Sequence, residues 1–321
     1  LRCKLIIELL FLITLRNSVK SQIDCRNNLL DFLWEIYMRK KLKIFILSIV
    51  LSVFIFGCRD SSGDALLQYI NMQDLLKPSQ INPEDYEDAF FDDFNGKDLD
   101  YSKWSKCDNE ERQSHLSNHG WWMKECAYVE NGNLVLECKK AENGRLFSGG
   151  IRSKGKFERT KGLYEIKFKV EDGSGFWYAF WIFAKNKPEN ISGSASNGAE
   201  LDCFEILPGM DKMMSTIHWD AYGSEHKQKG TEPKYLSSSF YNSWHIFQFE
   251  WSNNSYICYL DGARLWEMNG SDYGNGMCQV PGYMKITTEF GKEFGGELDS
   301  LIENGGTKKM LVDYVKFSTR K

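Results

Sequence analysis

The sequence predicts an all-β domain built from two sheets packed face to face. From about residue 89 onward, short runs rich in β-branched and aromatic residues alternate with turn residues. No long run with the 3.6-residue period of a helix interrupts them. More than ten strands in about 230 residues are too many for one flat sheet, so we expect them to divide between two packed antiparallel sheets.

The first clear strands lie in the N-terminal half of this domain. Residues 133–138 follow an Asn-Gly dipeptide, which is typical of a tight hairpin turn, and residues 163–170 alternate apolar with charged side chains. Residues 177–183 are aromatic on both faces, which favours a central strand covered on each side. The inward positions that the alternation predicts are Leu134, Leu136, Cys138, Tyr164, Ile166, Phe168 and Val170.

The C-terminal half continues the same pattern. Residues 241–251 and 256–260 flank a Ser-Asn-Asn turn and predict a hairpin. Residues 310–317 predict a closing strand.

The composition bounds the class of protein. Its 321 residues, 42% hydrophobic and 26% charged, indicate one sizeable globular domain with about sixty further residues of leader or linker. The formal net charge of -4 lacks the basic surplus of nucleic-acid binders, so we expect no nucleic-acid partner. Aromatic residues make up 14% of the chain, including 10 Trp, and such side chains suit flat ligands such as sugar rings.

The N-terminal segment has the pattern of a bacterial secretory signal over 38–58. Basic residues follow Met38, and an apolar run spans 44–56. We therefore interpret 1–37 as an upstream, non-native extension. A transmembrane anchor is the alternative, but the apolar blocks fall short of the ~20 residues that a span needs.

The residues before Cys58 resemble a lipobox, in which the cysteine is lipidated. We expect the exported protein to be lipid-anchored to a bacterial membrane, at the outer-membrane surface, or to be periplasmic. Residues 59–88 then form a linker and 89–321 form the domain.

The cysteines of the domain divide into two groups. Cys107 and Cys126 flank a loop-like stretch and could form a disulfide after export. Cys138, Cys203 and Cys258 lie in strand-like runs, where a buried free thiol is expected. No cysteine and histidine spacing fits zinc.

One predicted strand carries three acids, Glu200, Asp202 and Glu205. In a regular strand Glu205 would point away from the other two, because side chains alternate. A β-bulge at Cys203 or Phe204 inserts one residue and returns Glu205 to their face. Three adjacent carboxylates repel one another, and a site that must hold protons at different affinities explains such an arrangement.

The spacing of these acids fits one chemistry well. The Cα atoms of Glu200 and Glu205 would lie roughly 13 Å apart at ~3.3 Å per step, and their long side chains can lean together on a curved sheet. Carboxylates about 5–5.5 Å apart serve a retaining glycosidase, and Asp202 between them can keep the two glutamates in different protonation states. A solvated acidic face or a calcium site is the alternative.

At these residues the chain resembles glycoside hydrolase family 16, whose bulged catalytic motif is Glu-x-Asp-x-x-Glu. The similarity extends in order over residues ~89–321. The segments that carry it are 91–96, 99–100, 103–104, 148–154, 162–165, 175–181, 244–251, 259–262 and 312–314. The resemblance implies a β-sandwich jelly roll of two packed, curved antiparallel sheets, of the concanavalin A-like kind.

The resemblance also implies roles for individual residues. Glu200 would be the nucleophile, Asp202 its assistant and Glu205 the acid/base. The substrate contacts that it implies come from Trp177, Trp181, Arg152 and His218. No cofactor is expected for catalysis, while a structural calcium ion is implied at Asp313, Asp92 and a backbone carbonyl near Gly132.

The same resemblance favours a β-glucan substrate. The bulged motif is typical of laminarinase-like β-1,3-glucanases and of galactanases acting on agar or carrageenan. We expect a monomeric endo-β-glucanase that hydrolyses β-1,3- or mixed-linkage β-1,3-1,4-glucan with retention. A galactanase acting on agar or carrageenan is an alternative. A sulfated galactan needs a cationic cleft, and apart from Arg152 the segments expected there carry few positive charges. A non-catalytic glycan-binding surface lipoprotein is the other alternative.

Overall fold

The computed structural model describes residues 81–321 apart from 113–119, 186–190, 192, 274–275 and 291–296. The expected leader, Cys58 and most of the expected linker therefore lie outside the described residues. All described residues belong to the compact unit Asp64–Lys321. Within them, α6 (Ser300–Glu303) is the only α-helix, and no helix of this part is long and apolar enough to cross a membrane. The predicted all-β class is confirmed.

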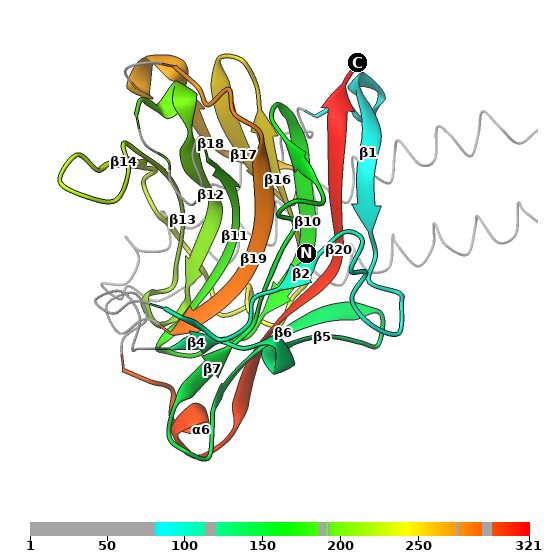
Figure 1. The fold of residues 1–321 in the computed structure, drawn as a ribbon. Coiled ribbons are helices and arrows are strands. Elements are labelled where there is room, and N and C mark those ends of the chain that lie inside the picture. The colour runs from blue at the N-terminus through cyan, green and yellow to red at the C-terminus, as the bar shows by residue number, and fades with distance from the viewer. Residues whose placement is uncertain (1–80, 113–119, 186–190, 192, 274–275, 291–296) are drawn as a thin grey trace, which may run out of the picture. The chain divides into compact units, whose positions relative to one another are not determined.

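The strands form two sheets (Figure 1). The first, eleven-stranded sheet has the order β18 (Ala263–Asn269), β17 (Ser255–Leu260), β16 (His245–Trp251), β10 (Gly162–Val170), β20 (Thr307–Arg320), β6 (Asn133–Lys140), β7 (Leu146–Ser148), β4 (Trp121–Trp122) and β3 (Glu110–Glu111), with β1 (Tyr86–Asp92) beside β20 and β5 (Ala127–Glu130) beside β6. The second, nine-stranded sheet has the order β14 (Lys227–Gly230), β13 (Lys212–Trp219), β12 (Ala199–Leu207), β11 (Phe176–Ala184), β19 (Gly282–Phe290), β8 (Gly150–Arg152) and β2 (Ser105–Lys106), with β15 (Lys234–Tyr235) beside β13 and β9 (Glu158–Arg159) beside β19. Short 3₁₀ turns are η1 (Pro83–Asp85), η2 (Lys124–Cys126), η3 (Ala195–Asn197), η4 (Pro208–Met210) and η5 (Gly270–Tyr273). Of the described pairings, β4 with β7 is parallel and the others are antiparallel.

The core between the sheets contains the side chains that the alternation predicted. All seven predicted inward residues of β6 and β10 are buried in one cluster, together with the even-numbered residues of β11 from 176 to 184. Burying a large apolar side chain stabilises the fold by about 1.5–3 kcal/mol. The core therefore fixes which face of each strand points outward, and with it the direction of the acids on β12.

The predicted turns are also present. Asn131 and Gly132 have φ angles of 52° and 72° between β5 and β6, the left-handed backbone that an Asn-Gly hairpin turn requires. The hairpin of β16 and β17 forms as predicted, although β16 begins at His245 rather than at 241.

The fold begins earlier than residue 89. Strand β1 starts at Tyr86 and pairs along β20, and Ile81 is buried beside Leu163 and Tyr259. The sequence pattern indicates a later start because Glu87, Asp88 and Ala89 are exposed, so that only the last residues of β1 alternate between buried and exposed.

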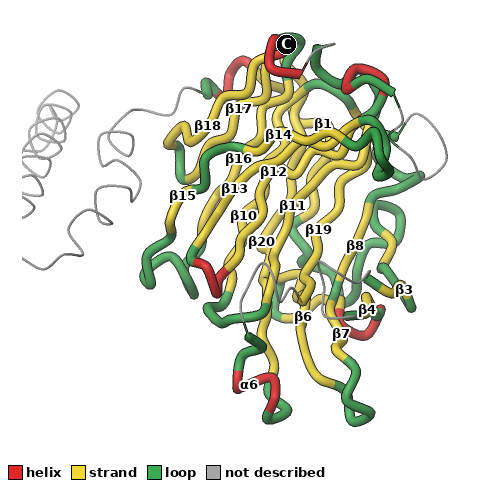
Figure 2. The backbone as a smooth tube through the Cα atoms, turned by 90° about the vertical axis from the view of Figure 1, so that its left-hand side faces the viewer, coloured by secondary structure: helices red, strands yellow, loops and turns green. Residues whose placement is uncertain are grey.

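Strand β11 occupies the centre of the nine-stranded sheet, as the aromatic residues on both of its faces predicted. Figure 2 shows β13, β12, β11, β19 and β8 side by side across this sheet. Ala179, Trp181 and Phe183 of β11 point away from the core and form a second apolar cluster. We call this outer surface of the nine-stranded sheet the site face.

Candidate active site

Strand β12 contains one extra residue at Cys203. Against β11, Phe204 pairs with Phe180 and Asp202 pairs with Trp181, so Cys203 has no opposite residue. The register against β13 shifts over the same segment. The extra residue that the sequence predicted is therefore present. Such a bulge places two successive residues on one side of the strand.

The bulge brings the three acids to the site face. Cys203 and Phe204 both lie in the core cluster, and the strand resumes its alternation afterwards. Glu200, Asp202 and Glu205 consequently share the opposite face.

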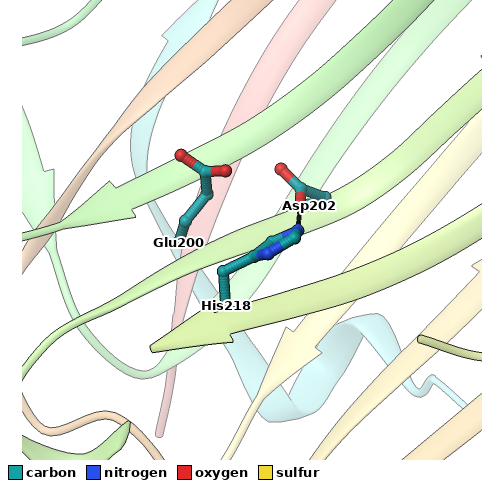
Figure 3. Close-up of side chains that lie close together, drawn as sticks. All are labelled: Glu200, Asp202 and His218. Atoms are coloured by element: carbon teal, nitrogen blue, oxygen red, sulfur yellow. Dashed lines mark ion pairs between the residues drawn. The ribbon is translucent and has the colours of Figure 1, made fainter. Parts of the chain in front are cut away.

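Each of the three carboxylates has a partner from β13 or from the turn that follows it. His218 Nε2 lies 3.2 Å from Asp202 Oδ2, and Figure 3 shows this ion pair beside Glu200. The Tyr222 hydroxyl donates to Glu200 Oε2 at 2.6 Å. The Thr216 hydroxyl donates to Glu205 Oε2 at 3.2 Å. Thr216 is the cross-strand partner of Asp202, so Glu205 leans back along the strand toward Asp202.

Burial and mutual repulsion disfavour the charged form of both glutamates. Burial, followed by the negative charge of Asp202, raises the pKa of Glu200 to about 7 and the pKa of Glu205 to about 8. The His218 cation lowers the pKa of both glutamates. The hydrogen bond from Tyr222 further favours ionised Glu200, and the hydrogen bond from Thr216 does so for Glu205. Both glutamates therefore keep their protons to a higher pH than a glutamate in water.

His218 is the cation of the site at neutral pH. Burial alone would lower the pKa of His218, but the hydrogen bond and charge of Asp202, with the two glutamates, raise it to about 9. Its other nitrogen, Nδ1, lies 2.9 Å from His226 Nε2, and the two rings are stacked with centroids 5.1 Å apart. The pKa of His226 is lowered by burial and by the His218 charge, so His226 is the neutral acceptor.

A metal ion at this site would have to displace the proton of His218. Glu200, Asp202 and His218 offer ligand atoms within 4.8 Å of one another, the one such group among the described residues. A histidine that binds a metal must be neutral. The ion pair with Asp202 instead holds His218 protonated.

The register extends the site across the sheet toward β8. Asp202 pairs with Trp181, Trp181 with Lys285, and Lys285 with Arg152. Trp122 covers the same region and donates from its indole nitrogen to the carbonyl of Thr288 at 3.1 Å. Arg112 stacks on the Trp122 ring at 3.7 Å.

The predicted substrate contacts lie around the acids, and their roles in binding stay predictions. Arg152 lies on this face and holds Glu110 through both guanidinium nitrogens, at 2.8 and 3.1 Å. Trp177 lies half-buried on β11, opposite Glu289 of β19. Trp181 is only 8% exposed, because the Lys285 ammonium lies 3.8 Å over its ring.

The residues predicted to bind calcium already have protein partners. Asp92 is buried and accepts from the Trp104 indole at 2.8 Å and from the Phe94 amide at 3.1 Å. Asp313 Oδ2 lies 2.6 Å from the Lys167 ammonium. An ammonium group on a carboxylate does not fit a calcium site, so calcium binding near Gly132 stays a prediction that this arrangement does not favour.

The disulfide expected between Cys107 and Cys126 is not formed. Both are buried free thiols. A Cβ added at Gly149 would meet the Cys126 carbonyl, whereas one added at Gly150 would meet Cys107 Sγ. Successive strand residues point to opposite sides, so this segment runs between the two cysteines. The predicted buried thiols at Cys138, Cys203 and Cys258 are confirmed.

Sequence reasoning missed several residues of this site. Tyr222 and His226 lie in and just after the turn that follows β13, where no pattern marks a contact with distant acids. Lys285 did leave a signal, because it and Glu289 are the two charges in a strand whose other residues are glycine, apolar or hydroxyl-bearing. Together with Arg112, it makes this face more cationic than the sequence suggested.

The chain matches known proteins over most of the domain. A family model described as "Glycosyl hydrolases family 16" matches residues 116–314. Glucan endo-1,3-beta-glucosidase A1 of Niallia circulans is 25% identical over 260 residues, which cover 70% of this chain and 36% of that protein. Keratan-sulfate endo-1,4-beta-galactosidase of Sphingobacterium multivorum is 26% identical over 254 residues, covering 75% and 57%. The chain thus spans between about a third and somewhat over half of these relatives.

Solved structures share the fold. The laminarinase catalytic domain from Thermotoga maritima superimposes with a TM-score of 0.59 at 22% identity and covers 74% of this chain and 99% of that one. A family 16 protein from a mixed-linkage glucan locus of Bacteroides ovatus gives a TM-score of 0.61 at 21% identity, with 71% and 99% covered. The two packed sheets described above are therefore arranged as in these proteins.

Proposed function

The chain belongs to glycosyl hydrolase family 16, and from this premise we propose that it is a retaining endo-β-glucanase that hydrolyses β-1,3- or mixed-linkage β-1,3-1,4-glucan. The observation that carries the proposal is the bulge at Cys203, which aligns Glu200, Asp202 and Glu205 on one face. A protein that only binds sugar has no need of three mutually repelling acids.

The proposed reaction has two displacement steps. Glu200 attacks the anomeric carbon while the glycosidic carbon–oxygen bond breaks and Glu205 gives its proton to the leaving oxygen. Water then attacks the anomeric carbon, Glu205 takes a proton from this water, and the bond from that carbon to Glu200 breaks, so that Glu200 leaves as a carboxylate. Two inversions at one carbon return the original configuration.

The partners of the acids support this assignment. The nucleophile must be ionised when the acid is protonated. The Tyr222 hydroxyl favours the ionised form of Glu200. Asp202 and His218 form an ion pair beside it, so that the negative charge of Asp202 is balanced.

The glucan assignment rests on the relatives, which include proteins named as a glucan endo-1,3-beta-glucosidase, a beta-glucanase and an endo-1,3-1,4-beta-glycanase. Endo-acting galactanase activity is the second candidate. It is favoured by the keratan-sulfate endo-1,4-beta-galactosidase among the relatives and by the cations Arg112, Arg152 and Lys285 near the acids.

We further propose that the protein is exported, anchored through a lipid at Cys58 and monomeric. The basis is the signal pattern over 38–58, which lies outside the described residues. Labelling of the full chain with a radioactive fatty acid, compared with a Cys58→Ser variant, tests the anchor.

The experiment that tests the enzyme proposal is the release of reducing ends from laminarin, barley β-glucan, lichenan and agarose. We expect activity on at least one glucan, a β-configured product in the first minutes by proton NMR, and a loss of about three orders of magnitude or more in Glu200→Gln. If the wild type is inert on all four but binds one of them, the protein is a glycan-binding protein instead.

A further inference from the structure

Lys285 is a buried cation of the site face without a carboxylate partner. It is only 7% exposed. Its ammonium lies 3.8 Å from the centroid of Trp181 and 4.5 Å from that of Trp122. Among the described residues, its ammonium makes no hydrogen bond and no ion pair.

The neighbouring cations differ from Lys285 in this respect. The Arg112 Nε lies 3.1 Å from Glu289 Oε1, and Arg152 holds Glu110 through two nitrogens. Each guanidinium is therefore neutralised by its own carboxylate. Arg112 and Lys285 also contact the same Trp122 ring, so they repel each other.

A buried ammonium loses its hydration and gains little from aromatic faces in return. Burial, and to a lesser degree Arg112, lower the pKa of Lys285 to about 8, while Glu200 and Glu289 oppose this. Lys285 is still largely protonated at neutral pH. It carries up to three N–H donors that need an acceptor, and a ligand on this face can supply one.

We propose that Lys285, supported by Trp181 and by the fully buried Trp122, forms a subsite for a sugar unit that carries an anionic group, either a sulfate ester or a carboxylate. The register places Lys285 two strands from Asp202, in the same cross-strand row. The anionic unit therefore belongs to the same glycan whose linkage reaches the acids, and it lies on the β19 side of them. This inference rests on the proposed glycoside hydrolase activity, and it favours an acidic glycan over a neutral β-glucan as the substrate.

Substrates that share a glycan backbone and differ only in their anionic groups test the inference. Hydrolysis is compared for laminarin, laminarin bearing sulfate esters and laminarin oxidised to C6 carboxylates, and for keratan sulfate with and without its sulfates. The wild type is expected to have a higher kcat/KM on an anionic member than on its neutral counterpart. Lys285→Met is expected to lower this anionic-to-neutral ratio roughly tenfold to a hundredfold, the usual worth of a hydrogen bond to a charged group.

Two further variants test whether the effect comes from the charge of Lys285 or from a change in the fold. Lys285→Arg is expected to retain part of the ratio, because it keeps the cation. Lys167→Met removes a lysine that also lies near a tryptophan, Trp244, but on the eleven-stranded sheet, and it is expected to leave the ratio unchanged.

A binding arm distinguishes failure of the inference from failure of the proposed function. In Glu200→Gln, the dissociation constants for sulfated and neutral laminarin are measured by calorimetry with and without Lys285→Met, at equal ionic strength. If the wild type cleaves no glycan, the enzyme proposal fails, and this arm still decides the subsite. The inference is overturned if Lys285→Met weakens anionic and neutral glycans equally, or if neutral glycans bind and react better in every pair.

Discussion

Replacing His218 with Gln should move the pH dependence of hydrolysis upward. The wild type is expected to give a bell-shaped kcat/KM profile, because activity needs ionised Glu200, with a pKa of about 7, and protonated Glu205, with a pKa of about 8. The His218 cation lowers both values. Without it, Asp202 remains as an unbalanced negative charge, so both pKa values rise and both limbs of the bell move to higher pH.

The structure sets the size of this effect. A titrating atom of His218 lies within 4.8 Å of the Glu200 carboxylate. Two unit charges at that distance interact by about 3.5 kcal/mol at an effective dielectric constant of about 20, which corresponds to about two and a half pH units. Since water and salt screen part of the charge, we expect both limbs to move by about one to two pH units. The rate at pH 6 should then fall by about tenfold or more relative to the rate at pH 9.

The assay is kcat/KM on the best glucan between pH 5 and pH 10. His245→Gln is the matched control, because His245 is also held by a carboxylate, Asp261 at 2.7 Å, but lies on the eleven-stranded sheet. It should leave the profile in place. The variant with both His218→Gln and Asp202→Asn loses both charges, so its limbs should return toward the wild-type positions. A His218→Gln profile that keeps its pH limits and loses only height would refute this reasoning.

Three further outcomes are expected. Tyr222→Phe removes the 2.6 Å hydrogen bond to Glu200, so the acidic limb should move to higher pH and kcat/KM at pH 7 should fall roughly tenfold, as a pH–rate series would show. Gly149→Ala would place a Cβ 2.1 Å from the backbone carbonyl oxygen of Cys126. We therefore expect the free energy of unfolding, measured by urea titration, to fall by about 3 kcal/mol or more. The control is Gly223→Ala, whose Cβ would have no atom within 4 Å, and it should change the free energy of unfolding by less than about 0.5 kcal/mol. Because the described cysteines are free thiols, dithiothreitol should leave Tm unchanged within about 1 °C, and a clear decrease would contradict this.

Much of the fold follows from local patterns. The alternation in β6 and β10 predicted their buried faces, and the aromatic residues on both faces of β11 predicted its central position. The bulge was predictable because only an inserted residue brings Glu205 to the face of Glu200. These predictions were correct because side chains alternate along a strand, so the spacing of two residues in the sequence determines whether their side chains point to the same face of the sheet.

The site residues that the sequence did not predict depend on contacts between segments that are distant in the chain. Tyr222 reaches Glu200 across 22 residues, and Arg112 reaches Glu289 from the other end of the domain. No local period records such contacts. The positive charge near the acids was underestimated for the same reason, because Lys285 joins Arg152 only through the pairing of β19 with β8.

The register of the nine-stranded sheet also separates chemistry from recognition. The three acids occupy three different cross-strand rows, which continue on β19 at Tyr283, Lys285 and Thr287. Exchange of one β19 side chain changes the groups in a single row and leaves the positions of the acids unchanged, although exchange of Lys285 also changes the pKa of Glu200. Point substitutions on β19 can therefore change substrate specificity while the three acids keep their positions. β19 is the strand on which to begin changing the substrate of the proposed enzyme.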